Sequence, residues 1–340
     1  MTAAVVSQRY ATLATIGNFN NQIGLPLTLL GLEPGHQLAV VELGTNNPGE
    51  IARLAEICTP DIGVITNIGP AHLEGLGSIE GVAQEKGSLL KGLQPNGKAV
   101  LNADDSRVRQ LASQTDREVH FYGFAPEAEV RADDVAEMEN GLTFTLKIAG
   151  QSEQVRLNSP GRFMVINALA AAAVGNLLGV SAAAIKAGLE AFEPVSGRMN
   201  IQHTPGGIHI IDDTYNANPE SMKAALKTLE AMRASARGIF VAGDMLELGR
   251  QAASLHRQIG SLAAQSGISR VYACGGHADS MAAGARKAGM PAASVITGSR
   301  EELIEDLTSW LQPGDWVLVK GSRGLAMEKV VDRLKAWRDE

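Results

Sequence analysis

Seven short apolar runs, separated by stretches with helical periodicity, constrain the fold of this sequence more than any other feature. Most of these runs carry few polar side chains, as strands do when both faces of their sheet are covered. Such strands in alternation with helices are typical of a doubly wound α/β fold with mostly parallel sheets. The runs that we expect to form strands are 38–43, 62–67, 99–102, 208–212, 238–242, 270–273 and 316–320.

Two segments depart from this alternation. Residues 130–157 are more polar and contain the alternating run LTFTLKI, which predicts an antiparallel hairpin at the edge of a sheet. Residues 192–200 bring Pro, Gly and Ser after a long Ala-rich helical stretch, which indicates a domain boundary. We therefore expect residues 1–197 to form a central α/β domain and residues 198–340 to form a C-terminal, Rossmann-like α/β domain.

Composition and charge exclude several classes of protein. The net charge is −7 and there is no basic block, which argues against binding of nucleic acid through its phosphates. The two cysteines, Cys58 and Cys274, lie far apart and suggest reduced thiols rather than a disulfide framework. There is neither an apolar run of membrane-spanning length nor a signal-peptide pattern. We expect a cytoplasmic monomer that does not insert into membranes.

Two polar residues follow consecutive predicted strands in the first half. Glu42 lies at the end of the run 38–43, and His72 lies in the loop after the run 62–67. If these strands are neighbours, both side chains reach the same edge of the sheet, where ligands of parallel sheets gather. A carboxylate oxygen and an imidazole nitrogen suit a divalent ion that phosphate and water also coordinate. The alternative is a solvated glutamate and a histidine that caps a turn.

A lysine interrupts an apolar stripe on the next predicted helix. Ser78 is a suitable N-cap, and Lys86 falls at i+7 from Ile79 and i+3 from Ala83. Burial would lower the pKa of this lysine and leave a neutral amine available for reaction. The alternative is a lysine that extends its charged end from the edge of the stripe to water.

A polar loop, GNFNNQIG, lies near the start of the chain. Its three asparagines, Asn18, Asn20 and Asn21, can donate and accept hydrogen bonds, which suits recognition of pyrophosphate, sugar or peptide. The alternative is an Asx-turn in which these side chains bond only to the backbone.

The second half has charged residues at strand ends. Asp212 and Asp213 end the run 208–212 or follow it, ahead of a helix that begins at Asn218-Pro219. Their position suits contact with a nucleotide ribose or with water on a metal, and the alternative is that they balance the positive helix end.

Two further turns in the second half also carry charge. Lys320 and Arg323 occupy a strand–helix turn that suits an anion. The turn GDMLELG, residues 243–249, adds acidic residues, so this face could hold a zwitterion, or a carboxylate near a phosphate.

Seven separated motifs occur in an order that resembles the Mur ligases of peptidoglycan synthesis. These motifs are GNFNNQIGLPLTLL, VELGTNNPGEI, NIGPAHLEGLGSIEGVAQEKGSLL, PVSGRMN, DDTYNANPESM, GDMLELG and VKGSR. The resemblance covers nearly the whole chain and is strongest to the members that add D-alanyl-D-alanine to UDP-N-acetylmuramoyl-tripeptide. It implies a P-loop NTPase-like central domain followed by a Rossmann-like ligase domain.

The resemblance also implies the chemistry and the residues that carry it. ATP phosphorylates a carboxylate to an acyl phosphate, an amine attacks, and amide, ADP and phosphate leave, with Mg²⁺ neutralising charge on the phosphates. Implied catalytic residues are His72 and Lys86, the latter as a carbamate. Implied metal ligands are Glu42, His72 and the Lys86 carbamate. Implied nucleotide contacts are Asn167, Arg198, Asp213 and Asn216, and implied substrate contacts are Asn18, Asn20, Asn21, Lys320, Ser322 and Arg323.

The sequence departs from the family pattern in two places. Phe163 and Met164 stand where members usually carry a His-Asn pair. Members also have an N-terminal uridine-binding domain and a GxxGKT-type phosphate loop, and no GxxxxGK[ST] match occurs here. We therefore expect residues 1–10 to be the body of the helix that follows that loop, and to fray. Two alternatives are a catalytically deficient fragment that only binds nucleotide or substrate, and a related Mur-type amino-acid ligase.

Overall fold

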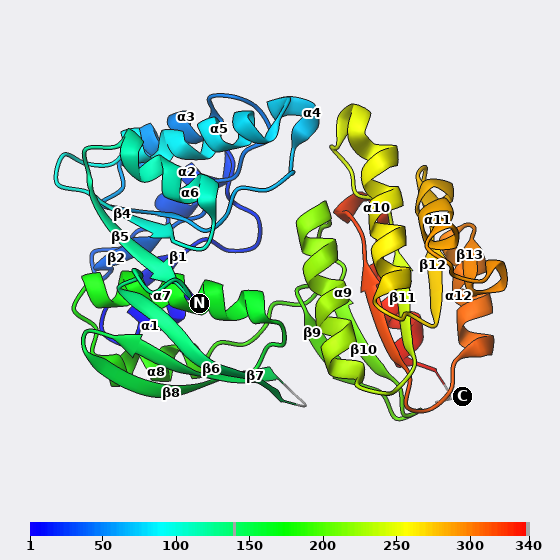
Figure 1. The fold of residues 1–340 in the computed structure, drawn as a ribbon. Helices are drawn as coiled ribbons and strands as arrows, with labels where there is room; N and C mark the ends of the chain where they lie inside the picture. Colours follow the sequence, from blue (N-terminus) through cyan, green and yellow to red (C-terminus); the bar gives the residue numbers. More distant parts are fainter. Residues whose placement is uncertain (139–140, 338–340) are drawn as a thin grey trace. The chain divides into compact units, whose positions relative to one another are not determined.

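The chain folds into two compact units, which we describe separately (Figure 1). The computed structural model describes residues 1–138 and 141–337. Unit 1 comprises Met1–Ala136, Leu142–Asn158 and Arg162–Phe192, and unit 2 comprises Glu137–Gly141, Ser159–Gly161 and Glu193–Glu340. Both contain parallel strands that alternate with helices, so the predicted fold class is confirmed. The domain limits expected from the sequence, 1–197 and 198–340, stay a prediction.

Unit 1 contains two sheets. One pairs β1 with β2 in parallel, and the other has the order β3-β4-β5-β6-β7-β8, in which β3 to β6 run parallel and β7 and β8 antiparallel. The predicted antiparallel hairpin is therefore confirmed at the edge of the larger sheet, with β6 as a third strand that the sequence did not separate. The strands are β1 (Thr12–Ala14), β2 (Leu38–Val40), β3 (Ile62–Ile65), β4 (Lys98–Asn102), β5 (Glu118–Gly123), β6 (Val130–Met138), β7 (Gly141–Ile148) and β8 (Gln151–Leu157).

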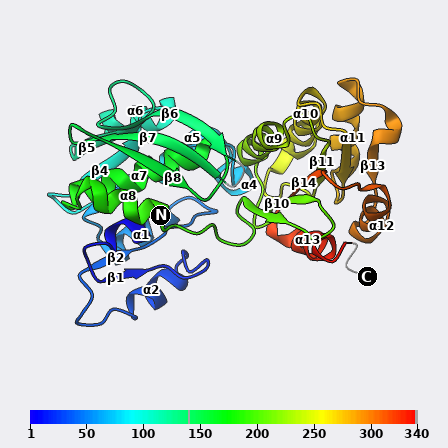
Figure 2. The ribbon, with the colours of Figure 1, turned by 90° about the horizontal axis from the view of Figure 1, so that it is seen from below.

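Helices cover the larger sheet of unit 1 on both sides. The Ala-rich helix α7 contacts β4 and β5, and α5 and α6 contact β3 and β4 (Figures 1 and 2). The helices are α1 (Thr2–Val6), α2 (Gly24–Leu29), α3 (Glu50–Cys58), α4 (Leu73–Leu76), α5 (Ile79–Lys91), α6 (Ser106–Leu111), α7 (Arg162–Leu177) and α8 (Ala182–Glu190), with a 3₁₀ turn, η1, at Ala112–Gln114.

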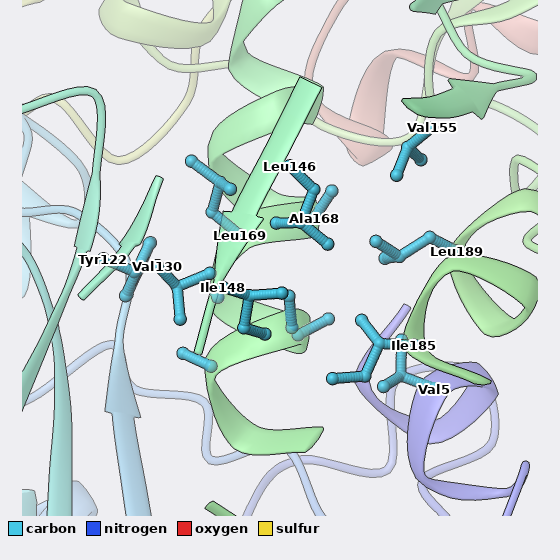
Figure 3. Packing of buried hydrophobic residues seen from close by; sticks show 14 of the residues in the cluster. Val5, Tyr122, Val130, Leu146, Ile148, Val155, Ala168, Leu169, Ile185 and Leu189 are labelled. Carbon is cyan, nitrogen blue, oxygen red and sulfur yellow. The ribbon is translucent and has the colours of Figure 1, made fainter. Parts of the chain in front are cut away.

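The first helix belongs to the core of unit 1. Val5 and Val6 are fully buried, and Val5 lies among side chains of α7, α8 and the strands (Figure 3). A Cβ at Gly175 would approach Val5 Cγ1 to 2.7 Å, and one at Gly188 would approach Val5 Cα to 2.6 Å. Glycine at both positions thus lets α1 pack closely. This packing argues against fraying of residues 2–6, whereas Arg9 is exposed.

Unit 2 is a three-layer α/β unit. Its sheet has the order β13-β12-β11-β14-β10-β9, parallel except for the edge strand β9. Helices α9 to α11 cover one face, and α12 and α13 cover the other (Figure 2). The strands are β9 (Asn200–His203), β10 (His209–Asp213), β11 (Gly238–Ala242), β12 (Arg270–Ala273), β13 (Val295–Thr297) and β14 (Trp316–Lys320). The chain order skips β14 between β10 and β11, so a topological switch point lies at these strands, where ligands bind in open sheets.

The helices of unit 2 connect these strands. They are α9 (Pro219–Arg233), α10 (Ala252–Gln265), α11 (Ala278–Lys287), α12 (Arg300–Trp310) and α13 (Glu328–Lys335). The described part of unit 2 also contains the 3₁₀ turns η2 (Gly249–Gln251), η3 (Ala292–Ser294) and η4 (Arg323–Leu325). Asn218 caps α9 by accepting from the Ser221 amide, with Pro219 in the first turn, so the predicted helix start is confirmed. Within residues 1–138 and 141–337, no helix is both long and apolar enough to cross a membrane.

Candidate active site

The asparagine-rich loop of unit 1 combines a backbone role with a contact to a carboxylate. Asn21 Oδ1 accepts from the amides of Ile23 and Gly24, at 3.0 and 2.9 Å, and so begins α2. Asn20 Nδ2 donates to Glu42 Oε1 at 2.9 Å. Asn18 is exposed. The structure thus brings Asn20 and Glu42 together and uses Asn21 as the Asx-turn residue that the sequence left as an alternative.

Glu42 follows β2 on the surface of unit 1. Its amide donates to Thr15 Oγ1 at 3.0 Å, and its carboxylate is exposed. Beside it, the amide of Gly44 donates to Asn20 O at 2.7 Å, and a Cβ on Gly44 would lie 2.7 Å from Asn20 Cγ. The close backbone approach at Gly44 therefore fixes the side chain of Asn20 against the segment that carries Glu42.

His72 lies at the end of the loop that follows β3. It is half-buried, adopts the left-handed conformation with φ 55°, and immediately precedes α4. β2 and β3 belong to different sheets, so the neighbouring-strand arrangement on which the sequence argument relied was wrong. Among the described residues, no three or more His, Cys, Asp or Glu side chains group in a way that could hold a metal. Convergence of Glu42 and His72 on one ion stays a prediction.

Lys86 contacts the start of the same loop. Its Nζ donates to the Asn67 carbonyl at 2.8 Å, and the next amide, of Ile68, donates to Asp105 Oδ2 at 2.8 Å. Burial lowers the pKa of the Lys86 ammonium group, and the nearby Asp105 carboxylate opposes that shift. The lysine is half-buried. It is thus neither fully enclosed on the apolar stripe nor fully extended to water, the two alternatives drawn from the sequence.

Glu85 is a residue whose importance the sequence analysis missed. The buried face of α5 runs through Val82, Glu85 and Leu90, so Glu85 takes the buried position on this stripe that we expected for Lys86. Glu85 Oε2 accepts from the Gly49 amide and Oε1 from the Ile51 amide, each at 2.7 Å. The carboxylate therefore binds the N-terminus of α3 from another helix. An acidic residue among apolar ones at i+3 from Val82 was the signal available in the sequence.

Asn167 lies on α7 beside one of the two residues that depart from the family pattern. Its Nδ2 donates to Met164 Sδ at 3.7 Å. One residue before that pair, the guanidinium of Arg162 lies 4.3 Å from the centre of the Phe124 ring. Met164 thus contacts the predicted nucleotide residue directly.

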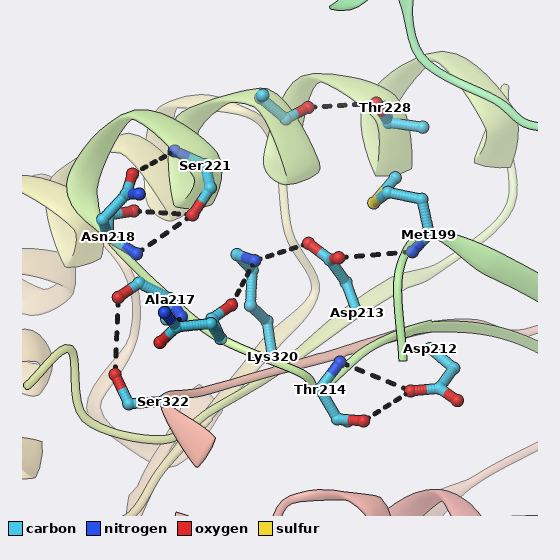
Figure 4. Close-up of polar contacts among 12 residues, drawn as sticks. Met199, Asp212, Asp213, Thr214, Ala217, Asn218, Ser221, Thr228, Lys320 and Ser322 are labelled. Carbon is cyan, nitrogen blue, oxygen red and sulfur yellow. Dashed lines mark hydrogen bonds and ion pairs between the residues drawn. The ribbon is translucent and has the colours of Figure 1, made fainter. Parts of the chain in front are cut away.

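A buried ion pair lies at the switch point of unit 2 (Figure 4). Lys320, only 2% exposed, places Nζ 2.6 Å from Asp213 Oδ2 and 2.8 Å from the carbonyl oxygen of Asn216. Asp213 Oδ1 accepts from the Met199 amide at 3.2 Å. The side chain of Asn216 is exposed, and its Oδ1 accepts from the Ala217 amide at 2.8 Å. Two predicted nucleotide residues and one predicted substrate residue therefore form one hydrogen-bonded group.

Arg198 lies on a segment that is anchored to the end of β10. Its guanidinium is exposed and lies 4.1 Å from the centre of the Tyr215 ring. The preceding residue, Gly197, donates its amide to the buried carboxylate of Asp212 at 3.2 Å and accepts from the Tyr215 amide at 2.9 Å. The buried Asp212 carboxylate thus binds the backbone of the segment 197–198. This contact and the Tyr215 amide fix the backbone next to Arg198.

Ser322 and Arg323 differ in exposure although they are adjacent. The buried Ser322 hydroxyl accepts from the Leu246 amide at 2.9 Å and donates to the Ala217 carbonyl at 3.4 Å. Arg323 is exposed and pairs with Glu328 at 3.3 Å. Ser322 therefore joins two loops of unit 2, and Arg323 reaches solvent.

Comparison with known proteins identifies the family. Residues 1–175 match the Mur ligase middle domain, and residues 197–323 match the Mur ligase, glutamate ligase domain. The chain belongs to the Mur ligase family. Members of this family are ATP-dependent ligases, and the enzyme class expected from the motifs is confirmed.

Individual Mur ligases resemble the chain over nearly its whole length. The UDP-N-acetylmuramoyl-tripeptide–D-alanyl-D-alanine ligase of Escherichia coli (strain K12) is 40% identical, over 98% of this chain and 73% of that protein. A crystal structure of MurF from Acinetobacter baumannii has a TM-score of 0.89 at 31% identity, covering 98% and 72% of the two chains. MurF of Thermotoga maritima in complex with ADP has a TM-score of 0.86 at 27% identity, covering 98% and 76%.

Proposed function

We propose that this Mur ligase adds D-alanyl-D-alanine to UDP-N-acetylmuramoyl-tripeptide, with ATP as the energy source. The observation that carries the proposal is its 40% identity, over 98% of the chain, to a ligase named for that reaction. In the proposed reaction the γ-phosphoryl group of ATP is transferred to the tripeptide carboxylate, and the dipeptide amine then attacks the acyl carbon. Phosphate leaves as the amide bond forms, and the amine loses one proton.

We propose Mg²⁺ as a second cofactor and test its fit on the donors of unit 1. Glu42 offers an exposed carboxylate that Asn20 orients, and carboxylate oxygen is the donor type that Mg²⁺ prefers. His72 would add an imidazole nitrogen, and a carbamate on Lys86 would add oxygens. The donor chemistry therefore fits the ion. When bound, Mg²⁺ would neutralise charge on the phosphate oxygens.

Lys86 is suited to form the carbamate. A neutral amine attacks CO₂, a C–N bond forms, and one proton leaves, so a lowered pKa favours the reaction. The Lys86 ammonium has such a pKa, and the hydrogen-bond acceptor at its Nζ is the neutral Asn67 carbonyl. A carbonyl can accept from an amine as well as from an ammonium, so loss of the proton does not break this contact.

The residues of unit 2 support binding of the nucleotide and the second substrate. We propose Arg198, Asn216 and Asp213 as the nucleotide contacts of unit 2, and Asn167 as the nucleotide contact of unit 1. Lys320 fixes the orientation of the Asp213 carboxylate through the 2.6 Å contact. The asparagine loop of unit 1 and Ser322 with Arg323 of unit 2 would contact the UDP-linked peptide or the dipeptide. We further propose a cytoplasmic monomer.

A direct assay tests this function. The chain is incubated with ATP, Mg²⁺, UDP-N-acetylmuramoyl-tripeptide and D-alanyl-D-alanine, and the amide product is followed by mass spectrometry beside phosphate release. We expect product and phosphate in equal amounts, and neither when the dipeptide is omitted. Binding of ATP without product would overturn the proposal in favour of a binding-only fragment. Product with single amino acids but not with the dipeptide would favour a related amino-acid ligase.

A further inference from the structure

Three loops at the carboxyl edge of the unit 2 sheet meet at Asp244. This residue follows β11, and its carboxylate accepts from the amides of Gly276 and His277, at 2.7 and 3.0 Å, in the turn after β12. Gly275 in that turn has φ +113°, and a Cβ there would lie 2.4 Å from Asp244 Cγ. The Asp244 carbonyl also accepts from the Ser322 amide, after β14, at 2.9 Å. Asp244 therefore links the loops that follow three parallel strands.

A fully buried histidine, His256 of α10, supports the same group of loops. Its Nδ1 lies 2.7 Å from the carbonyl of Ala252, and its Nε2 lies 2.9 Å from the amide nitrogen of Met245. A carbonyl can only accept and an amide can only donate, so the ring must carry its proton on Nδ1 and accept at Nε2.

Two titratable groups bear on this ring. Asp244 Oδ1 lies 3.6 Å from Nε2, and the His277 ring centre lies 4.7 Å from that of His256. Burial lowers the pKa of His256, and the Asp244 carboxylate opposes that shift while His277 adds to it. The neutral tautomer that the two hydrogen bonds demand is therefore also the form that burial favours.

The chain connects His256 to Ser322 in two steps. His256 accepts from the Met245 amide, and the next amide, of Leu246, donates to Ser322 Oγ at 2.9 Å. Segment 244–246 thus binds both the backbone amide and the hydroxyl of Ser322. His256 fixes that segment by accepting a hydrogen bond from the Met245 amide. Without an acceptor at His256, the buried Met245 amide would lack a partner, and the segment would shift to recover one.

We propose that His256 and Asp244 are positioning residues that fix loop 243–249 and, through it, Ser322 in the orientation that the amine substrate requires. The proposal rests on the proposed function, because Ser322 is a substrate residue only in that reaction. His256 touches no substrate in this scheme and acts through two consecutive backbone amides.

Two substitutions of His256 test whether its hydrogen-bond acceptor or only its side-chain volume is needed. His256→Leu keeps volume but removes the acceptor, whereas His256→Gln can present Oε1 to the Met245 amide. We expect His256→Leu to raise KM for D-alanyl-D-alanine about tenfold, with KM for ATP changed less than about twofold. His256→Gln should recover most of that loss. Ser254→Ala, at an exposed position on the same helix, is the matched control and should leave both KM values unchanged.

NMR and hydrogen exchange test the positioning role of His256 without measuring catalysis. In the wild-type chain, ¹⁵N shifts of His256 should report the Nδ1–H tautomer near neutral pH, and the amides of Met245 and Leu246 should exchange slowly. Exchange at both amides should speed up in His256→Leu and return in His256→Gln. An Nε2–H tautomer, or equal exchange in all three proteins, would overturn the inference. Absence of product in the wild type would instead count against the proposed function. The exchange data would still test whether His256 fixes the segment 244–246.

Discussion

The Lys320 ammonium lies 2.6 Å from the Asp213 carboxylate at adjacent positions of two paired parallel strands, β10 and β14. The ion pair is almost fully enclosed, with 2% of the lysine side chain and 13% of the aspartate side chain exposed. A second acceptor, the Asn216 carbonyl, satisfies another proton of the ammonium. Burial of this pair costs desolvation energy, so each partner depends on the other.

Removal of one partner should therefore destabilise unit 2. We expect Lys320→Met to lower its free energy of unfolding by about 3–5 kcal/mol, because the Asp213 carboxylate remains buried without its cation. Urea unfolding followed by tryptophan fluorescence measures this, since the three tryptophans, at 310, 316 and 337, all lie in unit 2. Lys223→Met removes an exposed pair of similar length, 2.7 Å to Glu220, and should cost under about 0.5 kcal/mol. Equal losses in both variants would contradict the prediction.

The lowered pKa of Lys86 predicts unusual reactivity. At a given pH below 10.5, its usual value, a larger fraction of Lys86 than of an exposed lysine is the neutral amine, so it should react at lower pH. Competitive labelling with a limiting acylating reagent, read peptide by peptide, measures this against Lys91, which is exposed on the same helix. A labelling curve for Lys86 shifted to higher pH than that of Lys91 would refute the assignment.

Substitution of Lys86 tests its proposed chemical role. Lys86→Arg keeps a cation that can still donate to the Asn67 carbonyl but cannot form a carbamate, because the guanidinium stays protonated. We expect product formation in the ligase assay to fall at least about 100-fold, the scale on which loss of a charge-stabilising group acts. Retention of full activity would show that no carbamate is needed.

The sequence was sufficient for the class of fold and the positions of its buried strands. Strands 238–242, 270–273 and 316–320 were predicted with their observed limits, because each is a short apolar run buried on both faces. It did not predict β1, β5, β9 and β13, whose residues are mostly not fully buried. Three of these strands, β1, β9 and β13, have only three or four residues, too few to show a period. The six residues of β5, EVHFYG, form no continuous apolar run, and the pairing of all four strands depends on distant segments.

The site was predicted less completely, since it depends on contacts between distant segments. Sequence spacing suggested Asp213 and Lys320 separately, whereas their pairing follows from the insertion of β14 beside β10. The role of Glu85 could not be predicted, because its partners lie 34 and 36 residues earlier, at the start of another helix. The sheet order likewise separated β2 from β3, against the arrangement assumed for Glu42 and His72.

Glu85 should contribute more to the stability of unit 1 than an exposed acidic residue does. Glu85→Ala leaves two backbone amides of the α3 N-terminus without their acceptor, so we expect a loss of about 2–3 kcal/mol. Hydrogen exchange at Gly49 and Ile51 measures the effect locally. Glu56→Ala, at an exposed position on α3, should change stability by less than about 0.5 kcal/mol. Protection of both amides at the wild-type level in Glu85→Ala would contradict the capping role.

Gly197 should be intolerant of a side chain, because its backbone conformation and its surroundings both require glycine. It has φ +75°, and a Cβ would lie 3.2 Å from both Thr214 Oγ1 and the Tyr215 nitrogen. Gly197→Ala should therefore cost unit 2 about 1–2 kcal/mol and displace the neighbouring Arg198 from the Tyr215 ring. Tryptophan fluorescence in urea gives the stability, and titration with ATP reports the displacement as weaker binding. Ser196→Ala, one residue earlier and exposed, is the control. Because Arg198 contacts ATP in the proposed function, wild-type ATP affinity in a destabilised Gly197→Ala protein would separate the two effects and argue against a nucleotide role for Arg198.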